Sequence, residues 1–190
     1  MKRIFDLIVS ALCLVVFSPL ILLCAIAIRL DDGLPVIYKQ ERIGRKGKPF
    51  FIYKFRTMCM DAEENGPMVL EVDGDDRLTR VGKFLREHHL DELPQLWNVF
   101  IGDMAFIGPR PERRFYIEQI MQRDARYEQL YALRPGVTSY ATLYNGYADS
   151  IEKMLKRLEL DLYYLQNRSW WMDTRILACT FLKIAGGKKF

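Results

Sequence analysis

An apolar run near the N-terminus constrains this chain more than any other feature. Residues 4–28 read IFDLIVSALCLVVFSPLILLCAIAI and carry one charge, that of Asp6. A helix needs about 20 predominantly apolar residues to cross the hydrocarbon core of a bilayer, so the run is long enough. It does not end like a secretory signal peptide, because the charged stretch RLDDGLP replaces a small-residue cleavage site. The run therefore predicts a helical segment inserted into a membrane.

A serine and a proline interrupt the middle of this run. Pro19 lacks an N–H and clashes with the preceding turn, which bends a helix. The Ser18 hydroxyl can bond to a carbonyl that the break leaves unpaired. Basic residues, which favour the cytoplasmic side, lie on both sides of the run: Lys2, Arg3, Arg29, Lys39, Arg42, Arg45, Lys46 and Lys48. A re-entrant helix would keep both ends in the cytoplasm; a single crossing with a tolerated proline is the alternative.

The rest of the composition describes one domain of modest size. The chain has 190 residues, a net charge of +4 and a mean hydropathy of −0.07, so a polar remainder offsets the apolar run. This mild basicity suits anionic lipid headgroups or phosphorylated substrates and is too weak to indicate a nucleic-acid partner. The four cysteines form no CxxC pair and have no histidine at zinc-ligand spacing, so we expect reduced thiols.

Sequence patterns predict a short hairpin followed by several helices. VIYKQ and FFIYKF flank GRKG within residues 36–58, which is typical of a β-hairpin. Residues 61–76 are acidic but lack calcium-loop spacing, so they predict a solvated loop. Thr79 should cap a helix that ends near residue 88. Further helices are expected within PQLWNVF, across 112–131 and over 149–166, and ALRPGVTSYATLYNGY is predicted to be a loop.

The C-terminal tail predicts a helix that lies in the membrane interface. Trp170 and Trp171 precede an apolar stretch, and Lys188 and Lys189 follow it. Tryptophans at a boundary with lysines beyond it are typical of an interfacial amphipathic helix. Ordinary packing in the protein core is the alternative.

Two adjacent carboxylates are the strongest candidates for chemistry. Asp91 and Glu92 lie between leucines and are followed by Pro94, which favours the first turn of a helix. The partial positive charge there stabilises an ionised carboxylate. An ionised aspartate in a sheltered site can act as a nucleophile or a magnesium ligand, and its neighbour can transfer protons. Simple helix capping at the surface is the alternative.

Three other groups in the sequence carry positive charge or can gain it. In GPRP the prolines on both sides of Arg110 fix the backbone, which suits bidentate contact with phosphate. In YKFRTM, Lys54 and Arg56 share one face of an expected strand. Either could instead be a solvated surface group. His88 and His89 point in different directions on a helix, so they predict neither a metal site nor a catalytic base.

The order of YKFRTM, LDELPQLWNV and GDMAFIGPRPE after a broken apolar segment resembles the bacterial sugar transferase family. These are the monotopic phosphoglycosyl transferases that start glycoconjugate assembly, and the resemblance runs from about residue 2 to the C-terminus. It implies the minimal catalytic form. The implied fold is α+β. A re-entrant helix-break-helix occupies residues 1–30. A mostly helical cytoplasmic catalytic domain, with a small β-hairpin and an interfacial C-terminal helix, occupies residues 31–190.

The resemblance also implies a reaction and roles for individual residues. Members transfer a sugar-1-phosphate from a UDP-sugar to polyprenol (undecaprenyl) phosphate at the cytoplasmic face of the bacterial inner membrane, and UMP leaves. By this match Asp91 is the nucleophile and a Mg²⁺ ligand, and Glu92 assists it. The implied substrate-binding residues are Lys54, Arg56, Arg86 and Arg110, and the membrane break is at Ser18 and Pro19. The motif departs from the usual small polar residues at His88 and His89.

Two alternatives and several details stay open. The chain could be a non-catalytic, membrane-anchored scaffold, in which case the carboxylate pair would be dispensable. It could also be a glycosyltransferase that passes on the sugar without its phosphate, which would release UDP rather than UMP. Neither the sugar, the pathway nor the formation of a homo-oligomer follows from the sequence.

Overall fold

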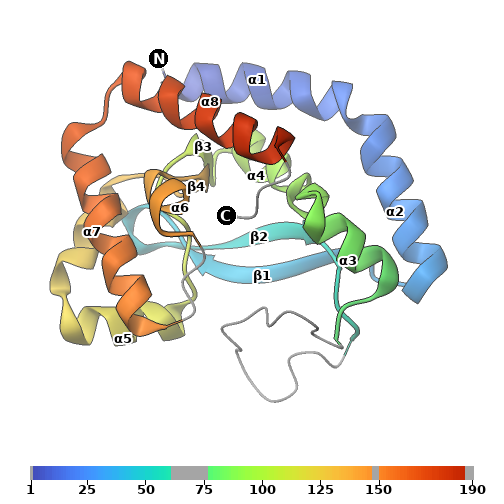
Figure 1. The fold of residues 1–190 in the computed structure, drawn as a ribbon, viewed down its shortest axis with the longest axis horizontal. Coiled ribbons are helices and arrows are strands. Elements are labelled where there is room, and N and C mark those ends of the chain that lie inside the picture. Colours follow the sequence, from blue (N-terminus) through green and yellow to red (C-terminus); the bar gives the residue numbers. More distant parts are fainter. Residues whose placement is uncertain (1, 61–76, 147–149, 187–190) are drawn as a thin grey trace.

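A computed structural model describes residues 2–60, 77–146 and 150–186 and shows a mostly helical α+β fold with two small sheets (Figure 1). The elements are α1 (Lys2–Val16), α2 (Ser18–Asp32), β1 (Ile37–Ile43), η1 (Arg45–Gly47), β2 (Pro49–Phe55), α3 (Arg80–Glu87), η2 (Leu90–Glu92), α4 (Gln95–Ile101), β3 (Ala105–Ile107), α5 (Arg114–Arg123), η3 (Ala125–Ala132), β4 (Gly136–Thr138), α6 (Tyr140–Asn145), α7 (Ile151–Asn167) and α8 (Trp170–Ala185). The expected loop over 61–76 and the lysines at 188 and 189 lie outside the described residues.

The N-terminal apolar run forms two helices, as predicted, and the chain bends by 60° between α1 and α2. Pro19 occupies the first turn of α2 and has no N–H for the carbonyl of Val15, four residues earlier. The Ser18 hydroxyl donates to that same Val15 oxygen at 2.8 Å. The break is therefore made by Pro19 and satisfied locally by Ser18.

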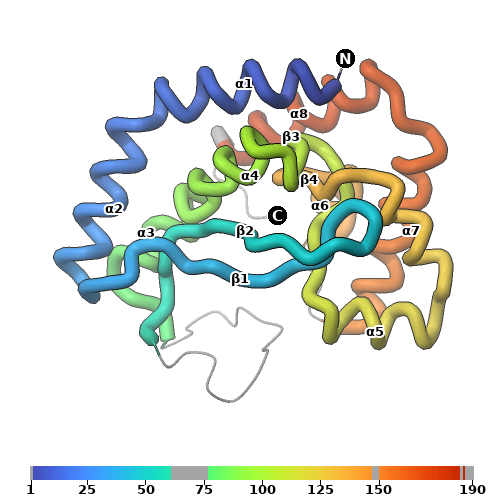
Figure 2. Tube along the Cα trace, turned by 180° about the vertical axis from the view of Figure 1, so that it is seen from behind, coloured from blue at the N-terminus to red at the C-terminus, as the bar shows by residue number. Residues whose placement is uncertain are grey.

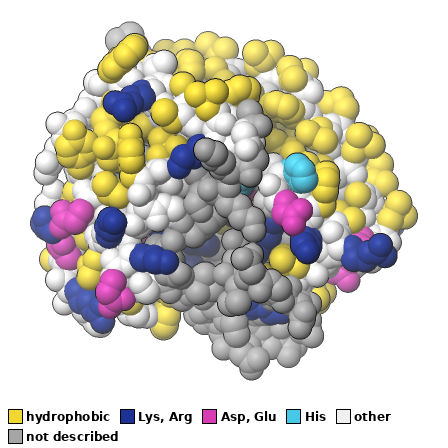
Figure 3. Space-filling model, in the orientation of Figure 1, with side chains coloured by type: hydrophobic (Ala, Val, Ile, Leu, Met, Phe, Trp, Pro, Cys, Tyr) yellow, Lys and Arg dark blue, Asp and Glu magenta, His cyan; other side chains and the backbone are white. Residues whose placement is uncertain are grey.

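The exposed surface of α1 is apolar and its buried side is polar, the reverse of a helix on a water-soluble protein. Ile8, Leu12 and Val15 are at least 60% exposed, whereas Asp6 and Ser10 are buried against the rest of the chain. Hydrophobic side chains gather along the upper and right-hand edges of the molecule, where α1 and α2 lie (Figure 3). Within the described residues no single helix is long and apolar enough to cross a membrane, but the bent pair together meets that requirement.

The N-terminus of α1 is tied to the interior at two points. Arg3 donates to the carbonyls of Val99 and Phe100, at the end of α4, over 2.5 and 2.7 Å. Lys2 forms an ion pair with Asp173 of α8 at 2.8 Å. Both views show α8 beside α1 (Figures 1 and 2). Two exposed tryptophans, Trp170 and Trp171, begin α8 on this side.

The predicted hairpin is present, and it forms the platform under the carboxylate pair. Strands β1 and β2 pair antiparallel with Ile37 opposite Phe55 and Ile43 opposite Pro49. Helix α4 packs along β2 through Asn98, a fully buried amide whose Nδ2 donates to the Phe51 carbonyl and whose Oδ1 accepts from the Tyr53 N–H. These two bonds fix the distance between β2 and α4.

The segment ALRPGVTSYATLYNGY, which was predicted to be a loop, contains strand β4 of a second sheet and helix α6, so that prediction was wrong. Strand β3 pairs in parallel with β4, and α6 follows β4 directly with Ser139 as its N-cap. The pairing requires Gly136 in β4 and Gly108 just after β3, because a Cβ on Gly136 would lie 2.1 Å from the Gly108 nitrogen. The two backbones therefore approach more closely than residues with side chains allow.

The helix expected across 112–131 is divided into two elements. Asp124 is extended (φ −148°), which ends α5, and its side chain accepts from the Arg126 N–H to start η3. The expected helix over 149–166 is confirmed as α7. Its buried side packs with α5 and η3 into the largest apolar cluster of the described chain, which includes Ile117, Ile120, Leu158 and Leu162.

Candidate active site

The carboxylate pair lies in a tight turn between α3 and α4. Thr79 caps α3 as predicted, accepting from the Gly82 N–H, and α3 ends at Glu87. His89 then adopts a left-handed conformation (φ 55°), which redirects the chain into the single 3₁₀ turn that holds Asp91 and Glu92. A bulky residue in this region is uncommon and marks a constrained site. The sequence suggested that the pair starts a helix, but the pair lies one turn before α4 begins.

Lys54 and Glu92 meet across the site, as the strand-face prediction required for a cation beside the pair. The Lys54 ammonium lies 2.6 Å from a carboxylate oxygen of Glu92, and both side chains are about four-fifths buried. Lys54 reaches Glu92 because Asn98 holds β2 against α4. Sequence analysis missed Asn98, although an amide among the apolar residues of LWNVF was a usable signal.

The two carboxyl groups have opposite pKa shifts. Burial raises the pKa of Asp91 to about 6, and the charge of Glu92 adds to that increase while Lys54 opposes it. Burial acts in the same direction on Glu92, but Lys54 and Arg110 outweigh it and lower the pKa of Glu92 to about 2. Glu92 is therefore the permanent anion of the pair. Pairs of acids whose pKa values are pushed apart are typical of active sites.

The other predicted binding residues fall into two groups. Arg86 donates to the Thr57 hydroxyl at 3.0 Å, and its charge lowers the pKa of Asp91. Arg110 acts in the same way on Glu92. Arg56 is placed elsewhere: it is 5% exposed and donates to the Asp32 and Gly33 carbonyls at the end of α2. The structure thus gathers Lys54, Arg86 and Arg110 around the pair and places Arg56 at the C-terminal end of α2.

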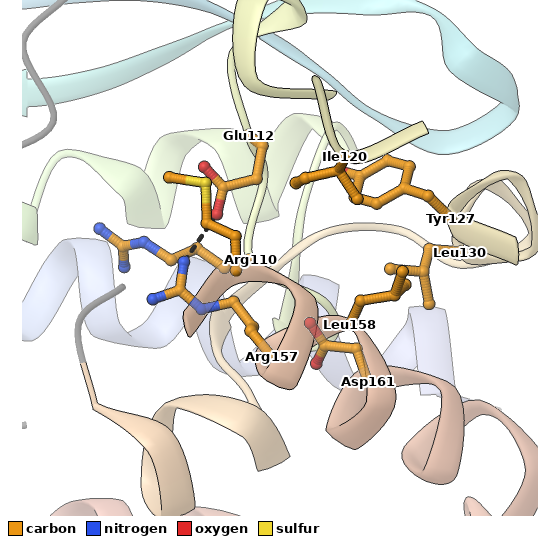
Figure 4. A pocket seen from close by; sticks show the side chains of 9 residues that line it. Arg110, Glu112, Ile120, Tyr127, Leu130, Arg157, Leu158 and Asp161 are labelled. Carbon is orange, nitrogen blue, oxygen red and sulfur yellow. Dashed lines mark hydrogen bonds and ion pairs between the residues drawn. The ribbon is translucent and has the colours of Figure 1, made fainter. Parts of the chain in front are cut away.

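A second buried charge cluster lies directly after Arg110 (Figure 4). Arg157 of α7 donates to the Glu112 carboxylate at 2.7 Å, and Arg42 of β1 lies 3.7 Å from the same carboxylate. Arg110, Glu112, Arg157 and Asp161 also line a cavity of about 10 Å³, roughly the space for one water. Sequence analysis missed this cluster.

Replacing Asp161 with asparagine should change how stability depends on pH. Burial raises the pKa of Asp161 to about 8, although Arg157 opposes the effect. The unfolded chain has an aspartate pKa near 3.9, so between these values only the folded state holds the proton. Stability then falls as pH rises, by up to about 1.4 kcal/mol per pH unit. In thermal unfolding of detergent-solubilised protein, the Tm of Asp161→Asn relative to wild type should rise steadily from pH 5 to pH 8.

Asp124 provides the control for this experiment. Its side chain is partly exposed, and its hydrogen bonds with Arg126 hold its pKa below the usual range. Asp124 is therefore ionised throughout pH 5 to 8 in both folded and unfolded chains, and Asp124→Asn should give a Tm difference that does not vary with pH. An equally flat difference for Asp161→Asn would show that Asp161 is ionised in the folded protein.

A family model described as bacterial sugar transferase matches residues 1–187, nearly the whole chain. The chain belongs to the bacterial sugar transferase family. This confirms the resemblance carried by the three motifs and the broken apolar segment. In the family match, the turn with Asp91 and Glu92 and the segment with Arg110 lie inside the matched residues.

Curated proteins of the bacterial sugar transferase family are similar over the full chain. The UDP-N-acetylgalactosamine-undecaprenyl-phosphate N-acetylgalactosaminephosphotransferase of Aeromonas hydrophila is 40% identical over 98% of this chain and 44% of its own length. The UDP-glucose:undecaprenyl-phosphate glucose-1-phosphate transferase of Escherichia coli is 39% identical over 96% of this chain and 40% of its own length. The exopolysaccharide production protein PSS of Rhizobium leguminosarum is 38% identical and matched over 98% of its length. The chain thus spans less than half of the first two relatives.

Proposed function

We propose that this protein transfers a sugar-1-phosphate from a UDP-sugar to undecaprenyl phosphate and releases UMP. The observation that carries the proposal is the buried pair Asp91–Glu92, with Lys54 bonded to one carboxylate and two arginines close by. Relatives that match the chain over at least 96% of its length are named for this reaction with different sugars. Family membership therefore supports the reaction class, and the site supplies groups that suit phosphoryl transfer.

The proposed mechanism is a two-step exchange at phosphorus. An oxygen of the Asp91 carboxylate attacks the β-phosphorus of the UDP-sugar, the bond from this phosphorus to the bridging oxygen breaks, and UMP leaves with that oxygen. A phosphate oxygen of undecaprenyl phosphate then attacks the same phosphorus and displaces Asp91 as a carboxylate. A covalent relay lets a water-soluble donor and a membrane-bound acceptor use one site in turn.

The surrounding residues have distinct roles in this proposal. Lys54 holds Glu92 ionised and close to Asp91, and Glu92 in turn orients Asp91. Arg86 and Arg110 bind phosphate oxygens of the donor. Arg56 keeps its predicted place among the substrate-binding residues only if the donor reaches the end of α2, where its guanidinium lies.

The carboxylate pair also fits the magnesium ion that the family resemblance implies. Among the residues that the structure describes, no group of three or more His, Cys, Asp or Glu side chains could hold a metal ion by itself. Mg²⁺ commonly uses one or two carboxylates and takes its other ligands from water and substrate phosphates. Lys54 occupies Glu92, so Asp91 is the carboxylate that would hold it. The ion would neutralise the charge of the diphosphate.

We further propose that α1 and α2 form a re-entrant hairpin over residues 1–30 and that residues 31–190 face the cytoplasm. The outward apolar surface of α1, the bend at Pro19 and the exposed tryptophans of α8 support this arrangement. The polar head of undecaprenyl phosphate stays at the headgroup level, so the carboxylate pair must lie there as well. Helix α8 would then rest in the interface.

Replacing Pro19 with leucine should straighten the helix and favour a full crossing of the membrane. Leucine restores the N–H that bonds to the Val15 carbonyl, which removes the cause of the bend. An accessibility tag at the N-terminus should be cytoplasmic in wild type and labelled from outside in a substantial fraction of Pro19→Leu. Leu22→Ala, an exposed change on α2, should keep the wild-type topology. An unchanged tag position in Pro19→Leu would place the cause of re-entry elsewhere.

The test of the proposed function is UMP release from a panel of UDP-sugars, with Mg²⁺ and undecaprenyl phosphate present. We expect one sugar to give lipid-linked product and an equal amount of UMP. Release of UDP would instead indicate transfer of the sugar without its phosphate. An absence of product with every sugar, in protein that is folded in bilayers, would favour the scaffold alternative.

A further inference from the structure

We propose that Arg157 of α7 is a positioning residue that fixes Arg110 for contact with the nucleotide diphosphate of the donor. The proposal rests on the proposed function, because it assumes that Arg110 binds the donor. Arg157 lies 47 positions along the chain from Arg110, and no family motif quoted above includes it. Its effect is transmitted through Glu112 and the proline-bounded segment between them.

Glu112 is held from two sides. Its carboxylate accepts from Arg157 Nη1 at 2.7 Å, and both side chains are less than 10% exposed. Its backbone carbonyl accepts from the Ile43 N–H at 3.1 Å, and Arg42 donates to the carbonyl of Pro111 at 3.0 Å. Strand β1 therefore holds the backbone just after Arg110, and α7 holds the side chain.

The segment before Arg110 is fixed as well. The Gly108 N–H donates to the Thr138 carbonyl at 3.1 Å, and the Gly136 N–H donates to the Pro109 carbonyl at 2.9 Å. Arg110 thus stands between two anchored ends, with a proline on each side. Because proline fixes its own φ and restricts the residue before it, this segment has little freedom to absorb a displacement of Glu112.

The two arginines point in different directions. Figure 4 shows Arg157 facing Glu112, whereas the guanidinium of Arg110 leads away from Asp161. Arg110 is also close enough to Glu92 to lower its pKa. Both terminal nitrogens of Arg157 are used within this region, because Nη1 donates to Glu112 and Nη2 donates to the Gly146 carbonyl at 3.1 Å. Arg157 therefore supports the proline-bounded segment that bears Arg110 and does not reach toward the carboxylate pair.

A purely stabilising role explains this arrangement poorly. A buried ion pair loses solvation that its attraction often fails to recover, so apolar residues usually stabilise such a position as well or better. The surroundings here are apolar, and they include Ile120, Leu130, Met154 and Leu158. A need to hold Glu112 in one position, and with it the segment that bears Arg110, would explain why Arg42 and Arg157 both lie beside its carboxylate.

The decisive experiment is a double-mutant cycle between Arg157 and Arg110. Arg157→Met should raise the KM for the UDP-sugar about tenfold and change kcat less than threefold, because misplacement of Arg110 weakens donor binding. In an Arg110→Ala background, Arg157→Met should add less than a twofold change, because nothing remains to be positioned. Arg157→Lys keeps the charge but lacks the planar guanidinium that bonds to Glu112 and Gly146 at the same time. Its KM should therefore lie between those of wild type and Arg157→Met.

Arg126 of η3 supplies the matched control, because η3 also packs against α7. It pairs with Asp124 and with Glu159 of α7, but it is half exposed. Arg126→Met should leave KM within twofold of wild type. If Arg157→Met does not fold, Arg157→Lys replaces it in the cycle. A KM effect of the same size with and without Arg110, or no effect at all, would overturn the proposal.

Two readouts separate this proposal from failure of the proposed function. Calorimetric binding of UDP requires no turnover, and Arg157→Lys should weaken it when Arg110 is present. Hydrogen exchange of the Ile43 amide, which bonds to the Glu112 carbonyl, should be at least severalfold faster in Arg157→Lys. If wild type releases no UMP from any donor, these readouts still decide the role of Arg157. Unchanged exchange, or no binding of UDP to wild type, would overturn it.

Discussion

Asp91→Asn is expected to reduce UMP release by about four orders of magnitude or more, which is typical when an enzyme loses its nucleophile. Asparagine keeps the size of the side chain and its buried position but cannot form the acyl phosphate. Intact-protein mass spectrometry of wild type incubated with donor and no acceptor should show an added phosphosugar. The same spectrum of Asp91→Asn should show no addition.

Asp161→Asn is the matched control, since it also removes a buried carboxyl group but lies on α7. Its turnover should stay within threefold of wild type. Wild-type turnover in Asp91→Asn would exclude Asp91 as the nucleophile. Lipid-linked product that accumulates without any adduct on the protein would exclude the covalent relay, even if Asp91 proved essential.

The second large effect is expected from Gly136→Ala, which should destabilise the fold by roughly 3–5 kcal/mol. The new Cβ would lie 2.1 Å from the Gly108 nitrogen and 2.4 Å from the Thr138 oxygen, and both are backbone atoms. Relief requires β3 and β4 to separate, which also moves the segment with Arg110. Thermal unfolding in detergent should show a Tm lower by many degrees, together with loss of turnover.

Gly186→Ala separates this effect from the general effect of adding a methyl group. At Gly186 the nearest atom to an added Cβ is the Leu182 oxygen at 3.1 Å, beside the end of α8. We expect a change of less than about 1 kcal/mol in the free energy of unfolding. If both variants unfold at the same temperature, β3 and β4 do not need the close contact that the structure shows.

The parts of the fold that sequence predicted correctly are those that local chemistry determines. Pro19 lacks an N–H wherever it stands, and Thr79 caps the next turn without help from distant residues. The β3–β4 pair could not be predicted in this way. This pairing depends on the close approach of Gly108 to Gly136, and in the sequence each of these glycines by itself predicts only a turn. The end of α5 at Asp124 had a local signal, an aspartate that can cap a new turn.

Sequence patterns predicted the two carboxylates of the candidate site and only some of the cations that surround them. Asp91, Glu92 and Lys54 lie together in the structure. The alternation of side chains along a strand placed Lys54 and Arg56 on one face, but it could not show that Arg56 pairs with Asp32 of α2. The cluster around Glu112 had a signal in α7 that was not used. Arg157 and Asp161 fall at helical spacing on the same apolar face as three buried residues of that helix: Met154, Leu158 and Leu162. Charges on such a face indicate a buried partner.

The two bonds from Arg3 to the last turn of α4 have a consequence for the proposed reaction. One guanidinium joins α1, the helix that we propose lies among the acyl chains, to the helix that follows the carboxylate pair. In that arrangement the thickness of the host bilayer, which sets the depth of α1, would also set the height at which Asp91 meets the proposed acceptor. Lipid chain length would then affect the rate of transfer, although no lipid tail has to touch the reacting groups.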